Sequence, residues 1–198
     1  MDYPVSYDEL EPFFTQFDEV AGVSGKAGNL KGQIQAGGNP FEGWRSKEYP
    51  MPALGTTYDS SKFEACAKSM GLHPFPAPAG IASTSYVNPY GMQMAPCNFC
   101  GFCERFGCYQ YSKSSPQTAV LDALKRKKNF SYRTHSEVLR VETAADGKTA
   151  TGVTYFDAIK QEEVFQPADL VILSSYQLNN VHLMLVSGIG EAYDPKTN

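Results

Sequence analysis

The stretch VLRVETAADGKTATGVTYFDA, residues 138–158, decides the fold of the second half of the chain. Apolar and polar residues alternate on both sides of Ala-Ala-Asp-Gly-Lys, as they do in half-buried strands joined by a turn. This pattern predicts strands over 137–142 and 151–156. Two further runs, 130–134 and 163–166, have the same character, and Asp-Ala-Ile-Lys-Gln supplies a second turn. Together these runs predict an antiparallel meander.

The residues after the meander predict one more strand and a helix. The run Leu-Val-Ile-Leu at 170–173 is short and wholly apolar, as in a buried strand. Residues 177–186 follow as a helix, which ends at Ser-Gly-Ile-Gly, 187–190. Because these glycines close a helix rather than open one, they do not by themselves form a dinucleotide-binding fingerprint.

Before the meander, the chain predicts helices separated by long loops. Ser6 and Glu9 have capping-box spacing, and apolar residues follow at helical spacing as far as Ala21. Pro12 is expected to kink or divide this helix. The segment 22–52 is rich in Gly, Asn and Pro and lacks clear periodicity, as in lids and binding loops. Its Gly-Val-Ser-Gly-Lys lacks the spacing of a phosphate-binding loop.

Two more helices are predicted before the meander. One covers about 61–70, where Phe63 and Cys66 share an apolar face, so Cys66 is expected to be a core thiol. The other opens at 115–116 and ends in the basic run 125–128, which suits the negative end of a helix better than a nucleic-acid patch. The order of elements predicts an α+β fold: helices and long loops, then the meander, a buried strand and a helix.

Composition narrows the classes of protein that the chain can belong to. Its 198 residues are 42% hydrophobic and 13% aromatic, which is enough to build a core and argues against disorder. A net charge of −4 gives no broad basic field, which argues against general nucleic-acid binding. No apolar run approaches the roughly 20 residues of a membrane span. The start of the chain lacks the basic and apolar regions of a signal peptide.

Four of the five cysteines lie in APCNFCGFCERFGCYQYSK, residues 95–113, with the spacing C-x2-C-x2-C-x4-C. The first three match the repeat of ferredoxin-type cluster ligands, although a ferredoxin run continues with three residues and a proline. Structural zinc sites usually have two knuckles separated by a longer stretch. Disulfides would close strained loops here. The spacing favours an iron–sulfur site and leaves zinc, disulfides or incidental packing open. These residues are Cys97, Cys100, Cys103 and Cys108.

The residues between these cysteines are mostly aromatic or Gly. We expect Phe99, Phe102 and Phe106 to keep water away from a bound cluster. Gly101 and Gly107 would let backbone N–H groups approach its sulfurs, and both effects tune a reduction potential. By contrast, no histidine forms a visible pair with a nucleophile, so the sequence predicts no catalytic residue. The three histidines are His73, His135 and His182.

Beyond these patterns, seven stretches of the chain resemble the glucose–methanol–choline oxidoreductase family. Within it, they are similar to the flavoprotein subunits of sugar-acid and polyol dehydrogenases. The stretches are YPVSYDELEPFF, SGKAGNLKG, GGNPFEG, CNFCGFCERFGC, YSKSSPQT, VLRVETAADGKTATGVTYFDA and PADLVILSSYQLNNVHLMLVSGIG. Such subunits are far longer, with an FAD-binding turn upstream and a catalytic histidine near the far end. The resemblance therefore implies a middle fragment of this fold.

The resemblance also implies domains and cofactor sites. Residues 1–114 would belong to the substrate domain or lid and carry the cysteine loop, and 115–198 would belong to the FAD-binding domain. The four clustered cysteines would include the ligands of a 3Fe–4S cluster that relays electrons from FAD. The backbone at Val138 would contact the FAD adenine. By resemblance, then, Cys97, Cys100, Cys103 and Cys108 are metal ligands and Val138 is a cofactor-binding residue.

The resemblance implies the oxidation of a CH–OH group in a gluconate-like sugar acid or a polyol. Electrons would pass to a cytochrome c or quinone acceptor. The expected partners are a small companion subunit and a membrane-bound cytochrome c subunit, on the periplasmic side of the inner membrane, with no nucleic acid. We expect the fragment alone to be inactive. Two rivals remain: a zinc-binding module that interacts with RNA or protein, and an interaction or pseudo-enzyme domain.

Overall fold

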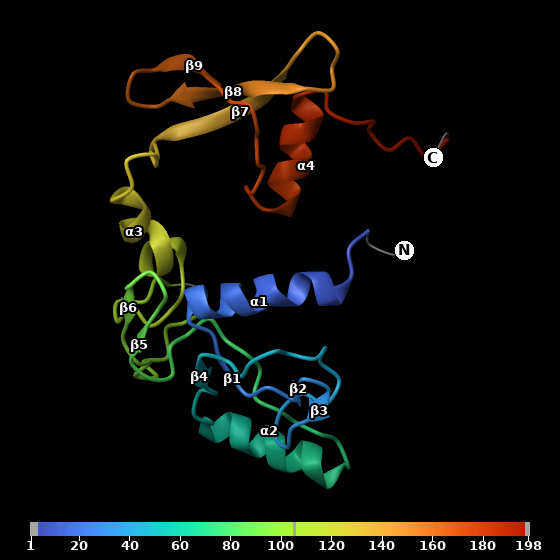
Figure 1. Cartoon of the computed structure of the whole chain (residues 1–198), viewed down its shortest axis with the longest axis vertical. Coiled ribbons are helices and arrows are strands. Elements are labelled where there is room, and N and C mark those ends of the chain that lie inside the picture. Colours follow the sequence, from blue (N-terminus) through green and yellow to red (C-terminus); the bar gives the residue numbers. More distant parts are fainter. Residues whose placement is uncertain (1–3, 105, 197–198) are drawn as a thin grey trace. The chain divides into compact units, whose positions relative to one another are not determined.

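A computed structural model describes residues 4–104 and 106–196. The chain divides into two compact units, Met1–Phe130 and Ser131–Asn198. Figure 1 labels their elements. None of the described helices combines the length and the apolar composition that crossing a membrane requires. The first unit contains α1 (Tyr7–Ala21), β1 (Ser24–Gly25), β2 (Asn29–Leu30), β3 (Gln33–Ile34), β4 (Met51–Pro52), α2 (Tyr58–Ser69), β5 (Tyr86–Val87), β6 (Gln93–Met94), the π-helical turn η1 (Gln117–Leu121) and α3 (Asp122–Lys125).

The first helix, α1, begins at the predicted capping box. The Ser6 side chain accepts from the Glu9 N–H, and the Glu9 carboxylate accepts from the Ser6 N–H. The helix then runs through Pro12 without interruption, so the prediction of a divided helix is wrong. A proline removes one backbone donor, whereas the capping box and the left-handed Gly22 cap hold both helix ends.

The buried face of α1 is polar. Glu11 is 3% exposed, and Thr15 is also buried, whereas the rings of Phe13 and Phe17 are 66% and 65% exposed. The Glu11 carboxylate accepts from the Thr15 hydroxyl at 2.8 Å and from the backbone N–H of Ser46 at 2.7 Å. The helix therefore meets the long loop through hydrogen bonds to its backbone, rather than through the predicted apolar face.

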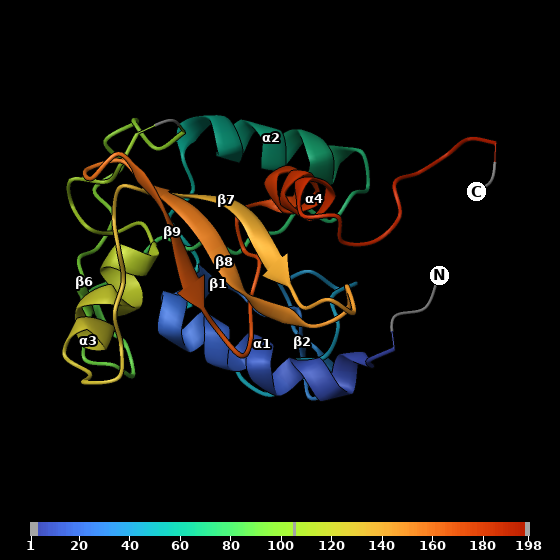
Figure 2. The ribbon, with the colours of Figure 1, turned by 90° about the horizontal axis from the view of Figure 1, so that it is seen from above.

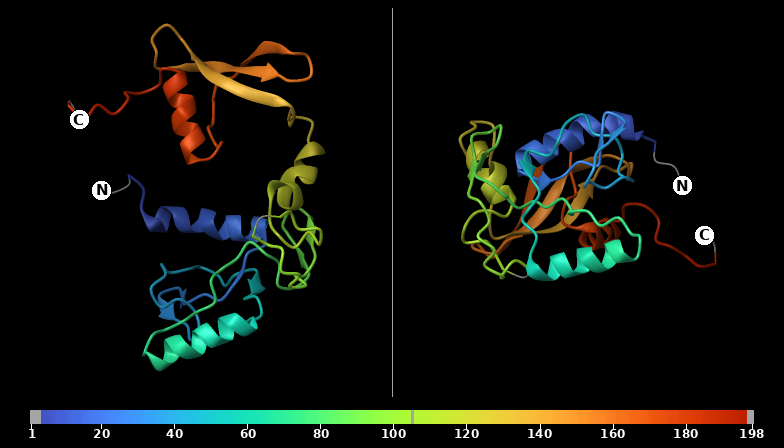
Figure 3. Two further views of the ribbon diagram at one scale, coloured as in Figure 1. Left: turned by 180° about the vertical axis from the view of Figure 1, so that it is seen from behind. Right: turned by 90° about the horizontal axis from the view of Figure 1, so that it is seen from below.

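The long loop 22–52 is organised by short strands and side-chain hydrogen bonds. Strand β1 pairs with β4 in parallel, and β2 pairs with β3 antiparallel. In Figures 1 and 3 these strands lie between α1 and α2. The Glu48 carboxylate accepts from the Ala27 N–H at 3.0 Å, and Arg45 pairs with Asp18 at 2.5 Å. A small core of Met51, Ala82 and Met94 closes this layer.

The second helix, α2, shows that the prediction of Cys66 as a core thiol is wrong. Ala67 is its only buried residue, and Cys66 is exposed together with Phe63 and Met70. The apolar spacing that predicted a buried face is present, but no described element covers it. An apolar face becomes core only where another element packs on it.

The third predicted helix forms as the π-helical turn η1 followed by α3. A buried amide, Asn88, holds this region together. Its Nδ2 donates to the carbonyls of Ala119 in η1, at 2.7 Å, and Val20 in α1, at 2.9 Å. Its Oδ1 accepts from the N–H groups of Tyr90 and Met92, each at 3.0 Å. One side chain thus joins α1, η1 and the β5–β6 turn.

The second unit contains the predicted meander. Strands β7 (Ser136–Thr143), β8 (Ala150–Asp157) and β9 (Glu162–Pro167) form an antiparallel sheet in that order, seen from above in Figure 2. Its register shifts between Val138 and Arg140, which marks a bulge. Helix α4 (Gln177–Val186) has the predicted bounds and packs on β7.

Two predicted strands do not form. Residues 130–134 are irregular, and His135 takes a left-handed φ of 56° that interrupts an extended run immediately before β7. Residues 170–173 pair with no described strand, and Leu170 and Ile172 are 75% and 77% exposed, so the buried-strand prediction is wrong here. An apolar run needs a neighbouring backbone before it becomes a strand.

Candidate functional site

The cysteine loop, defined here as residues 97–113, is closed at its base by one buried residue. The backbone N–H of Cys97 donates to the Ala82 carbonyl at 2.8 Å. The N–H of Ala82 in turn donates to the Ser112 carbonyl at 2.8 Å. Because Ala82 is fully buried, it fixes the entry and the exit of the loop together on the core of the first unit.

The four thiols of the loop are free and differ in exposure. No disulfide joins any of the five cysteines of the chain, so the structure gives no support to the disulfide alternative. The thiols at the two ends of the loop and the second thiol are half-buried, and the third is exposed. In order, these residues are Cys97, Cys100, Cys103 and Cys108.

Two of the thiols accept hydrogen bonds from backbone N–H groups. Burial raises the pKa of Cys108, but the N–H groups of Gln110, Ser112 and Lys113, with the Ser112 hydroxyl, outweigh burial and lower it. The sulfur of Cys97 accepts from the Phe99 N–H at 3.4 Å. Such donors stabilise thiolates, the form that binds metals. The base of the loop is therefore suited to hold two thiolate ligands.

The loop does not gather its thiols into a finished metal centre. Within residues 4–104 and 106–196, no three His, Cys, Asp or Glu side chains lie close enough to hold a metal ion. The donor chemistry nonetheless fits an iron–sulfur cluster, whose ligands are cysteine thiolates. The predicted ligand set therefore stays a prediction, with suitable donors on one loop.

The aromatic side chains of the loop do not shield its thiols in this structure. Phe99, Phe102 and Phe106 are each more than half exposed, contrary to the expectation that they exclude water. Phe102 and Phe106 contact each other edge to face, with ring centroids 6.1 Å apart. These rings have no apolar surface to cover while the thiols remain apart, so they contact each other and solvent.

Val138, the predicted cofactor-binding residue, lies in the second unit. It stands on β7, opposite Tyr155 of β8, and its side chain is partly exposed. Strand β7 is at the edge of the sheet, so one row of its backbone groups is outside the ladder. The contact of Val138 with FAD stays a prediction.

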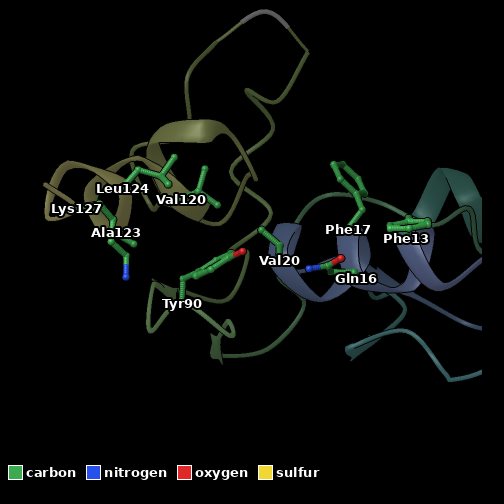
Figure 4. A pocket seen from close by; sticks show the side chains of 9 residues that line it. All are labelled: Phe13, Gln16, Phe17, Val20, Tyr90, Val120, Ala123, Leu124 and Lys127. Atoms are coloured by element: carbon green, nitrogen blue, oxygen red, sulfur yellow. The ribbon is translucent and has the colours of Figure 1, made fainter. Parts of the chain in front are cut away.

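An open apolar groove of about 440 Å³ lies elsewhere on the first unit. Figure 4 shows α1 side chains on one side and those of η1 and α3 on the other, with Tyr90 between them. No cysteine, histidine or carboxylate lines the groove, and Lys127 is its one charged lining residue. Its lining residues are Phe13, Gln16, Phe17, Val20, Tyr90, Val120, Ala123, Leu124 and Lys127.

The three histidines of the chain lie outside the cysteine loop. His135 and His182 are exposed in the second unit, and His73 is exposed on the extended segment after α2. Thr134 Oγ1 lies 3.0 Å from His135 Nδ1. No nucleophile–base pair arises from these contacts.

Sequence reasoning missed the residues that support the loop. Ala82, Ser112 and Lys113 carry no motif of their own, because their roles depend on hydrogen bonds that form only when the chain folds. Lys113 lies in YSKSSPQT, one of the stretches that resemble the family. That stretch was a signal of family membership, but it did not indicate which residue contacts the loop.

Residues 79–196, which include the cysteine loop, the meander and α4, match the GMC oxidoreductases. The chain belongs to the GMC oxidoreductase family. Over its whole length it is 50% identical, across 200 aligned residues, to the gluconate 2-dehydrogenase flavoprotein of Pantoea cypripedii. It spans 32% of the length of that relative.

Proposed function

We propose that the native protein carrying this chain is an FAD-dependent dehydrogenase that oxidises a CH–OH group of a gluconate-like sugar acid or a polyol. The observation that carries the proposal is the 50% identity, over the whole chain, to a gluconate 2-dehydrogenase flavoprotein. The family match over 79–196 supports the same class of reaction. Because the chain spans about a third of that relative, we expect the chain alone to be inactive.

We further propose that the cysteine loop holds an iron–sulfur cluster of the 3Fe–4S type. Bound FAD supplies hydride acceptance, and a cluster supplies one-electron transfer to an external acceptor. Support comes from four free thiols on one loop and from the N–H donors to Cys97 and Cys108. In this proposal the chain's role is to hold the thiolates and fix the loop base on Ala82.

For FAD, the proposal assigns Val138 a backbone contact with the adenine. Its support is the position of Val138 on an edge strand, beside the bulge between Val138 and Arg140. A bulge shifts the alternation of backbone groups, so it changes which of them face the free edge. The resemblance also places residues 1–114 in the substrate domain or lid and 115–198 in the FAD-binding domain, and we retain this division as part of the proposal.

The proposed partners follow from the same resemblance. They are a small companion subunit and a membrane-bound cytochrome c subunit, with the complex on the periplasmic side of the inner membrane. The relative's description as a flavoprotein supports a flavin-carrying role. Co-purification of the native protein with a haem-containing subunit tests this arrangement, and a protein that transfers electrons without such a partner contradicts it.

The cluster assignment is tested by alanine substitution within the loop. In the native protein, C103A is expected to abolish the visible absorption of the cluster, because by resemblance Cys97, Cys103 and Cys108 are the three ligands and Cys100 is the extra thiol. C66A is the matched control, since Cys66 is an exposed thiol of the same unit outside the loop. A C103A protein that keeps its full iron content would overturn the assignment.

A further inference from the structure

Lys113 contacts the cysteine loop at two separate places. Its Nζ donates to the carbonyl of Phe106 at 3.0 Å and also to the carbonyl of Cys103. One side chain therefore holds the backbone at two points, one at the exposed third thiol and one at Phe106.

The backbone of Lys113 is itself fixed on the core. It forms a β-bridge with Ile81, and its neighbour Ser114 donates from its N–H to the Gly80 carbonyl at 2.7 Å. On the other side, the Ser112 carbonyl accepts from buried Ala82 at 2.8 Å. The side chain of Lys113 thus reaches the loop from a backbone that is hydrogen-bonded on both sides.

The ammonium group of Lys113 has no carboxylate partner in the described part of the chain, where lysines and arginines elsewhere form eight ion pairs. Its charge is directed instead at the loop carbonyls. Thiolate ligands bring negative charge to this loop, and a cation nearby favours the charged form.

From these contacts we propose that Lys113 is a positioning residue for the cluster: it holds the backbone at Cys103 and at Phe106 and supplies a compensating positive charge. This inference rests on the proposed function, because it concerns the same cluster. Lys113 binds no iron itself. It acts through the carbonyls that it holds and through its charge, as residues next to metal ligands commonly do.

The proposal predicts two changes in K113Q, which removes the charge and shortens the reach of the donor. Removal of iron by a chelator is expected to become about tenfold easier, in line with the loss of other residues that support metal ligands. The midpoint potential of the remaining cluster is expected to fall, because reduction adds an electron next to a site that has lost a positive charge.

The experiment uses the native protein in four forms: wild type, K113Q, K113R and K128Q. K128Q is the matched control, because Lys128 is an exposed lysine of the same unit that lies outside the loop in sequence. It is expected to match wild type in chelator resistance and potential. K113R keeps a charge and donors and is expected to lie between K113Q and wild type.

Two failures can be told apart. If wild type holds a cluster and K113Q matches it in chelator resistance and potential, the role of Lys113 is overturned while the proposed function stands. If wild type itself holds no iron and sulfide, both fall. A K113R protein no better than K113Q would overturn the role of the charge. A K113Q protein that fails to fold, judged by circular dichroism, would also contradict a role confined to the loop.

Discussion

Within each of the two units of this chain, a different kind of contact stabilises the fold. In Met1–Phe130, short strands and loops are joined by side chains that bind backbone groups, as Glu11 binds Ser46 and Asn88 binds Ala119. In Ser131–Asn198, a regular backbone ladder of three strands carries helix α4. The difference shows that a loop-rich unit depends on a few buried polar residues, whereas a sheet distributes its stability over many backbone bonds.

The largest predicted effect is that of removing the Asn88 amide. N88A leaves buried partners in α1, η1 and the β5–β6 turn without their hydrogen bonds, so we expect the free energy of unfolding of the first unit to fall by about 3 kcal/mol. Denaturant titration followed by the fluorescence of Trp44, the single tryptophan, measures this. N129A, an exposed asparagine of the same unit, is the control; equal stability of both variants would refute the comparison.

The next effect concerns the polar face of α1. E11Q removes a buried carboxylate that accepts from Ser46 and Thr15, and should lower the free energy of unfolding by about 2 kcal/mol. Control variant E64Q loses only a surface pair with Lys68, worth about 0.5 kcal/mol. The same Trp44 titration distinguishes them, and a loss in E11Q no larger than in E64Q would contradict the role of this face.

The contribution of Glu11 should also depend on pH. Burial raises its pKa, but the hydrogen bonds from Ser46 and Thr15 and the charge of Arg45 outweigh burial and lower it. A lowered folded-state pKa gives stability that is present above the unfolded value, about 4.3, and is lost as pH falls through the folded value. The difference between wild type and E11Q should therefore shrink in acid. A difference that grows in acid would show that the sign is wrong.

The second unit should respond more weakly to the loss of one polar side chain. Ser187 Oγ accepts from the Val141 N–H at 2.8 Å and connects the end of α4 to β7. S187A should cost about 1 kcal/mol and accelerate hydrogen exchange at the Val141 amide. S174A, at an exposed serine, should leave that exchange rate unchanged. A loss in S187A as large as in N88A would remove the contrast between the units.

The smallest effect is expected at Cys66. Because its side chain is exposed on α2, C66S should change the free energy of unfolding by less than about 0.5 kcal/mol. A core thiol would cost several times more, since burying a hydroxyl without a partner is unfavourable. Thermal unfolding of the two proteins side by side decides between these cases.

The same contrast explains how much of the fold the sequence could predict. Alternation over 137–142 and 151–156 and helical spacing over 177–186 located β7, β8 and α4, because each pattern is local. The patterns failed where burial depends on whether another element packs on the residue. Leu170 and Ile172 lie outside the sheet, and Cys66 faces solvent. Apolarity indicates a residue that can be buried, and only a neighbouring element buries it.

For the candidate site, too, the local features could be predicted from the sequence and the contacts made by folding could not. Spacing alone located the four thiols of the cysteine loop, because ligand motifs are local in sequence. The contacts that shape the loop could not be predicted, since Ala82 binds it from another part of the chain and Lys113 folds back onto carbonyls within it. Nor could spacing reveal that the aromatic rings, such as Phe102, are exposed.

The most direct test of the account is the iron and acid-labile sulfide content of the native protein, purified without oxygen, together with an EPR spectrum of its oxidised form. We predict about three irons and four sulfides per chain and an EPR signal in the oxidised state. Zinc without sulfide, or a protein with neither iron nor sulfide, would contradict the electron-transfer role of the cysteine loop.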